Sequence, residues 1–210
     1  MQSVFGSEVE HLRRIPQTVR TLQVPIREAA LVSGFVLPIP KELWRLLHFL
    51  YTQGRDDSRL FSLESLPEEE ELIRECLDTG EDFPSEISAS AISGVLIEFL
   101  MVLRSPVVMT EWLDLFCLEY VETGRSKVDL TDRFVNSLTE GSGNCVKAVF
   151  AMLRHLLSQS SHLSKERLSQ IFLEALTHAD QTLAKRKIQD FDSLHLLRFH
   201  RQGFLTLFFR

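Results

Sequence analysis

From Lys41 onward, large apolar side chains recur at the spacing of an α-helix, and this periodicity limits the available folds more than any other sequence feature. The clearest stretch places apolar residues at i, i+3, i+4 and i+7, namely Leu43, Trp44, Leu46, Leu47 and Leu50. An amphipathic helix is therefore predicted over 41–53. Further helices are predicted between Pro67 and Gly80 and at about 89–104, 110–122, 130–139, 143–158, 164–178 and 183–198.

Residues suited to helix ends support several of these boundaries. Ser65 with Glu68 has the spacing of a capping box, Pro67 suits a first turn, and Gly80 suits a C-terminal stop. For the later helices, the predicted N-caps are Ser142 or Asn144 for 143–158, and Ser164 for 164–178. These elements predict an all-α domain of about seven helices joined by short loops.

The two ends of the chain differ from this helical part. Residues 1–27 contain a β-prone run closed by Pro25, which predicts one or two strands. Two strands alone are marginally stable, so 1–27 is interpreted as the remnant of a β domain. Residues 28–40 form a connector punctuated by Gly and Pro, and the helical domain is assigned to 41–193.

The last segment, 194–210, combines leucines and phenylalanines with Arg198, Arg201 and Arg210. A basic apolar tail of this kind is suited to an anionic membrane surface. The same pattern fits a final helix that packs on the domain, or a C-terminal end with no selected role. All three interpretations stay open from sequence.

Composition excludes several classes of site. The chain has 44% hydrophobic residues, normal for a core-forming domain, and its net charge of −6 argues against nucleic-acid binding. Three cysteines, far apart and in no metal-ligand spacing, are expected to be reduced thiols. The seven histidines show no zinc-site spacing, and neither a metal site nor a cofactor is predicted.

Four segments carry a family resemblance, which covers nearly the whole chain. Residues 60–62 (LFS) and 73–80 (IRECLDTG) resemble the active loop and following helix of Rho GTPase-activating (RhoGAP) domains. Residues 39–51 (IPKELWRLLHFLY) resemble the opening helix of a RhoGAP-like subgroup, the C-terminal domain of type II inositol polyphosphate 5-phosphatases. Phe5-Gly6-Ser7 followed by Ile15-Pro16 is similar to the end of the immunoglobulin-like ASH domain that precedes it there. The phosphatase domain itself has no counterpart in this chain.

The resemblance implies where the family's functional residues fall. The arginine finger, which stabilises the transition state of GTP hydrolysis, falls on Ser62. A lysine and an arginine that contact the GTPase fall on Ile97 and Met101, and an asparagine that contacts it falls on Ala175. Small or apolar side chains cannot make the hydrogen bonds of the residues they replace. The resemblance therefore implies a domain that is not an enzyme.

Arg59 leaves an alternative open, because it lies three positions before Ser62 in the same polar loop, with Arg55 nearby. A displaced finger at Arg59 would make the domain a weak GTPase activator for Rho-family GTPases. The plainer interpretation is an exposed arginine beside Asp56 and Asp57, which is a solvated charge.

Trp44, with Leu47 and His48, forms the second candidate site. In the resembling subgroup, a cleft beside the matching tryptophan receives a helical peptide carrying a Phe and a His, borne by endocytic adaptor proteins. The alternative is that Trp44 only packs in the core. Trp112 is predicted to be a core residue from the burial habits of tryptophan.

The resemblance also implies partners and location. The implied partners are Rho-, Rac- or Rab-family GTPases and endocytic adaptor proteins. The implied location is cytoplasmic, peripheral to early endosome and Golgi membranes. Membrane contact would be indirect or through 194–210. Taken together, the sequence predicts a catalytically inactive RhoGAP-like interaction module in endocytic and phosphoinositide signal transduction.

Overall fold

A computed structural model describes residues 39–54, 57–62, 66–123, 127–178 and 199–209 of the 210-residue chain. Every regular element in these ranges is a helix, which confirms the all-α prediction. The elements are α3 (Lys41–Gln53), α4 (Pro67–Thr79), α5 (Ala89–Met101), α6 (Thr110–Thr123), α7 (Lys127–Ser137), α8 (Glu140–Gln159), α9 (Lys165–Thr177) and the 3-10 helix η4 (Thr206–Phe209). The predicted strands of 1–27, most of the connector and the predicted helix 183–198 lie outside the described residues.

The ends of α4 confirm two predictions and correct one. Pro67 occupies the first turn, and Gly80 ends the helix in the left-handed region at φ +83°, donating its N–H to the carbonyl of Cys76. The predicted Ser65–Glu68 capping box is wrong, because Leu66 is the N-cap and no side chain caps it. The third helical position therefore belongs to Glu69, whose carboxylate accepts from the backbone N–H of Ser88 ahead of α5.

Helix α8 begins three residues earlier than predicted. Thr139 is its N-cap, and its hydroxyl accepts from the backbone N–H of Ser142 at 3.3 Å. The predicted caps Ser142 and Asn144 are therefore wrong, since both lie inside the helix. Ser164 does cap α9 as predicted, accepting from the backbone N–H of Arg167 at 3.2 Å.

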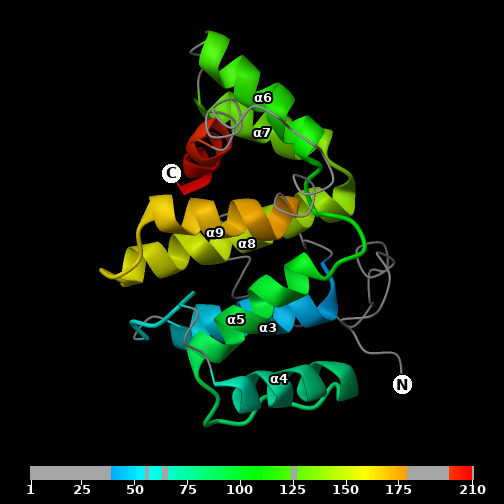
Figure 1. Cartoon of the computed structure of the whole chain (residues 1–210), viewed down its shortest axis with the longest axis vertical. Helices are drawn as coiled ribbons and strands as arrows, with labels where there is room; N and C mark the ends of the chain where they lie inside the picture. The colour runs from blue at the N-terminus through cyan, green and yellow to red at the C-terminus, as the bar shows by residue number, and fades with distance from the viewer. Residues whose placement is uncertain (1–38, 55–56, 63–65, 124–126, 179–198, 210) are drawn as a thin grey trace, which may run out of the picture.

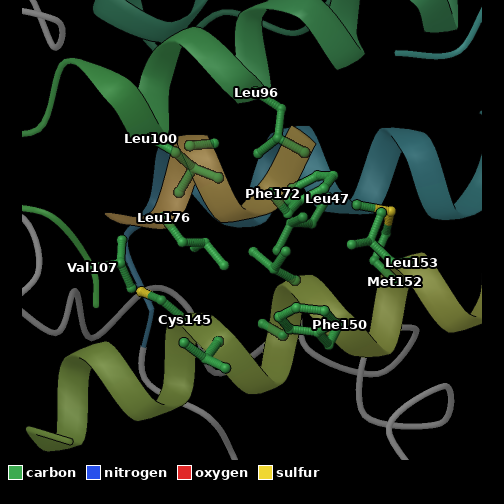
Figure 2. Close-up of a cluster of buried hydrophobic side chains, with 14 of the residues drawn as sticks. Leu47, Leu96, Leu100, Val107, Cys145, Phe150, Met152, Leu153, Phe172 and Leu176 are labelled. Carbon is green, nitrogen blue, oxygen red and sulfur yellow. The ribbon is translucent and has the colours of Figure 1, made fainter. Parts of the chain in front are cut away.

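The helices stack in layers, as Figure 1 shows. Helix α4 lies at one end against α5, and α5 packs on α3 and α9. The pair α8 and α9 forms the next layer, and α6, α7 and η4 lie at the other end. Figure 2 shows the shared core, where Leu47, Leu96, Leu100, Phe150 and Phe172 converge from α3, α5, α8 and α9. All five are at most 2% exposed, so burial of these faces holds the layers together.

The described part of the C-terminal segment packs on the domain. Residues 199–205 are helical and continue into η4. Phe204 is fully buried, with its ring centroid 5.3 Å from that of Phe134 on α7. Arg201 is 7% exposed and donates two hydrogen bonds, of 2.6 and 2.7 Å, to the carboxylate of Asp114 on α6. Among the three interpretations of the tail, these contacts are those of a final helix that packs on the domain.

Three further observations complete the fold. Cys76, Cys117 and Cys145 are free and buried. Burial raises the pKa of the Cys117 and Cys145 thiols to about 12. In the part of the chain that the structure describes, no helix has both the length and the apolar character needed to cross a bilayer.

Candidate functional site

The loop that carries Ser62, residues 57–62, is held by hydrogen bonds to α5. The carboxylate of Asp57 accepts from the backbone N–H of Ser90 at 3.1 Å and from that of Arg59 at 2.8 Å. The hydroxyl of Ser90 donates to the carbonyl of Arg59 at 3.1 Å, and this carbonyl also accepts from the N–H of Ser62 at 2.9 Å. The N-terminal turn of α5 therefore fixes the path of the loop.

Phe61 anchors the far end of the same loop. Its backbone lies in the left-handed region at φ 57°, which a bulky residue rarely adopts without support. Support comes from Ser93, whose hydroxyl accepts from the N–H of Phe61 at 2.9 Å. It also comes from Phe172 of α9, whose ring meets that of Phe61 edge to face at 5.4 Å. The buried Phe61 side chain thereby sets the position of Ser62.

The other three positions implied by the resemblance lie on α5 and α9, the two helices that contact this loop. Ile97 and Met101 follow Ser93 at intervals of four residues, so the three share one side of α5. Ile97 is partly buried against the core and Met101 is exposed. Ala175 is fully buried in α9, which packs on α5. At none of these four positions does the side chain present a charge.

Arg59 is exposed at the outer side of the loop, with 58% of its side chain accessible. Its guanidinium Nε lies 3.6 Å from the carboxylate of Asp57, which is too long for a hydrogen bond. The neighbour Arg55 lies outside the described residues. Arg59 is therefore a loosely paired surface charge rather than a guanidinium held at a defined point.

Arg167, in the first turn of α9, is a residue of this site that the sequence analysis missed. Its Nη2 donates to the carbonyl of Phe61 at 3.3 Å, across 106 positions of sequence. That carbonyl belongs to the peptide unit joined to Ser62, so a guanidinium lies directly beside the serine's backbone. No local pattern links two residues this far apart, and only the packing of α9 on the loop brings them together.

The second candidate site lies on α3. Trp44 is only 4% exposed, and its indole stacks on the half-buried imidazole of His48 with ring centroids 4.5 Å apart. Leu47 is fully buried in the core. Among the described residues, no acceptor meets the buried Nε1–H of Trp44. An unpaired buried donor of this kind is costly, and it makes Trp44 unusual among core residues.

His48 gives this site a measurable pH dependence. Burial lowers the pKa of its imidazole, so the folded state favours the neutral ring. The unfolded chain takes up a proton near the ordinary histidine pKa of about 6.5. We therefore expect the free energy of unfolding contributed by His48 to be complete above that pH and to fall as the pH drops below it. Urea unfolding of the natural chain and of His48→Gln at pH 7.5 and 5.5 measures this, and an equal pH response in both would contradict it.

Trp112 was predicted to be a core residue, and this is wrong. Its side chain is 48% exposed on the outward side of α6, where Leu115 and Leu118 are also exposed. The opposite side of α6 supplies the core with Leu113 and Phe116. Because α6 carries apolar residues on both sides, its sequence does not indicate which face is buried.

Within the described ranges, no three His, Cys, Asp or Glu residues gather closely enough to hold a metal ion.

Comparison with known proteins identifies a family match and a similar curated protein. The RhoGAP domain family matches residues 40–181 of the chain. The type II inositol 1,4,5-trisphosphate 5-phosphatase of Mus musculus is 29% identical over an alignment of 163 residues that covers 74% of this chain and 16% of the mouse protein. The chain therefore spans about a sixth of that relative's length.

A solved structure shows the same fold. The crystal structure of human Rho GTPase activating protein 15 superposes with a TM-score of 0.65, covering 81% of this chain and 80% of that one. Sequence identity in this pair is 14%, so the likeness concerns the fold alone.

Proposed function

This chain belongs to the RhoGAP domain family, and from that premise we propose that it is a catalytically inactive interaction module that docks small GTPases without accelerating GTP hydrolysis. The observation that most supports this is the hydroxyl of Ser62 where the resemblance places an arginine finger. A finger accelerates hydrolysis by about 10³–10⁵-fold, or about 4–7 kcal/mol of barrier. A neutral hydroxyl cannot supply the positive charge that this requires.

Single-turnover GTP hydrolysis by Rac-type and Rab-type GTPases tests the loss of catalysis. We expect the rate with saturating domain to stay within about twofold of the intrinsic rate. An active RhoGAP domain serves as the positive control. Acceleration of about a hundredfold or more, abolished by Arg59→Ala, would instead establish the displaced finger and overturn the proposal.

A peptide-binding role at Trp44 is the second part of the proposal. The stacking of Trp44 on His48 supports it, because the half-buried imidazole brings this pair of rings to the surface, where a helical peptide would find an apolar contact. Adaptor proteins with a Phe/His helical motif are the proposed partners, and early endosome and Golgi membranes the proposed location.

Titration of a fluorescent Phe/His helical peptide into the protein tests this site. We expect Trp44→Ala to weaken binding by about tenfold or more, as for an aromatic anchor at the centre of an interface. Trp112→Ala is the matched control, since it removes an exposed tryptophan from α6. Circular dichroism shows whether Trp44→Ala keeps its helical fold. The milder variant His48→Ala removes a peptide contact without removing a core residue, so a loss of affinity there reflects the contact itself. Equal peptide affinity of the natural chain and of the three variants would exclude the site.

A further inference from the structure

The guanidinium of Arg167 donates to a backbone carbonyl, as that of Arg45 does, whereas three other described arginines donate to carboxylates. Arg74, Arg133 and Arg201 each donate to carboxylates, at distances between 2.6 and 3.2 Å. Within the described ranges, Arg167 pairs with no carboxylate and its side chain donates to the neutral carbonyl of Phe61. Its positive charge is therefore held in place without being neutralised there.

The position of this charge is set from two sides. Arg167 lies in the first turn of α9, where the cap Ser164 fixes its backbone. Its guanidinium then meets the carbonyl of Phe61, a residue clamped by Ser93 and Phe172. The Arg167 side chain is exposed, and a guanidinium offers five N–H donors, so contact with one carbonyl leaves donors for a ligand.

We infer that Arg167 binds an oxyanion of a GTPase docked over the Ser62 loop. The inference rests on the proposed function and assigns a contact residue to it. Guanidinium groups match phosphate and carboxylate oxygens in both charge and geometry. Arg59 on the same loop is also exposed, but the carboxylate of Asp57, 3.6 Å from its Nε, offsets its charge, so the inference rests on Arg167. The oxyanion is either the terminal phosphate of bound GTP or a carboxylate on the GTPase surface.

The experiment measures the Kd of the full chain for a Rac-type GTPase loaded with a non-hydrolysable GTP analogue or with GDP. We expect Arg167→Gln to weaken binding of the GTP-analogue form by about tenfold, as for loss of a charge-assisted hydrogen bond. Arg133→Gln is the matched control, because it removes the same charge from α7, where Glu119 already neutralises it. If the loss occurs only with the GTP analogue, the oxyanion is the terminal phosphate. An equal loss with GDP assigns a carboxylate.

Salt dependence separates an anion contact from a loop tether. An anion contact requires the affinity of the natural chain to fall more steeply with salt than that of Arg167→Gln. Arg167→Lys, which keeps the charge, should recover part of the lost affinity. Binding of the natural chain together with unchanged affinity in Arg167→Gln, or with equal salt slopes, would overturn the inference and leave the proposed function standing. Failure of the natural chain to bind any GTPase tested would overturn both.

Discussion

Replacing Phe204 by alanine is expected to destabilise the domain by about 3–5 kcal/mol, the range for a buried phenylalanine. Phe204 is fully buried, and its ring contacts those of Phe134 and Phe208 at 5.3 and 5.8 Å. Removing the ring loses apolar burial and leaves a cavity between the helical residues 199–205 and α7, because close-packed neighbours refill such a space only partly. Urea unfolding followed by circular dichroism measures the change.

Phe199 provides the matched control, since it is the same residue type in the same segment but 71% exposed. We expect Phe199→Ala to change stability by no more than about 0.5 kcal/mol. Equal, small effects of both substitutions would mean that residues 199–209 do not belong to the folded domain, and a role of the tail outside the domain would regain support.

Arg201→Met gives the second large expected loss, about 2–4 kcal/mol. The side chain of Arg201 is 8% exposed and that of Asp114 is 24% exposed. Breaking a buried pair costs about 3–5 kcal/mol because the remaining charge is left without a partner. Partial exposure of Asp114 lowers this cost, since water can solvate part of its carboxylate.

A double substitution tests the cause of that loss. With Arg201→Met and Asp114→Leu together, no uncompensated charge remains, so we expect the double variant to recover more than half of the lost stability. Arg133→Met is the control, since its pair with Glu119 is more exposed and should be worth at most about 1 kcal/mol. A double variant no more stable than Arg201→Met would show that packing, rather than charge, accounts for the loss.

Periodicity predicted the type and the approximate position of most described helices. Helix α3 spans the predicted 41–53 because one apolar stripe faces the core and polar residues bound it. The start of α8 was misplaced because Gly141 and Gly143 are poor helix formers, and the predicted helix began only at 143. Gly143 is helical for a reason that only the fold supplies. A Cβ there would lie 3.0 Å from the carbonyl oxygen of Val135, so a side chain at this position would force α7 and α8 apart by a few tenths of an ångström.

The candidate site was predicted only in part. The resemblance pointed to position 62, and the structure adds the framework that holds it. Asp57, Ser90 and Ser93 are short polar residues of types common in any loop or helix cap. Nothing in their spacing indicates that they form the hydrogen bonds between the 57–62 loop and α5. Arg167 reaches the loop only through tertiary packing. Contacts between distant segments of this kind leave no trace in periodicity or composition.

The buried cysteines have a practical consequence for following this domain in solution. Thiol reagents attack the deprotonated sulfur, and Cys117 and Cys145, with pKa values near 12, hold almost none of that form at neutral pH. Burial raises the pKa of the Cys76 thiol as well. A maleimide dye should therefore label a single cysteine introduced at an exposed site, such as Ser161→Cys, while the natural thiols stay unmodified. Partner binding can then be followed by fluorescence without first removing any native sulfur.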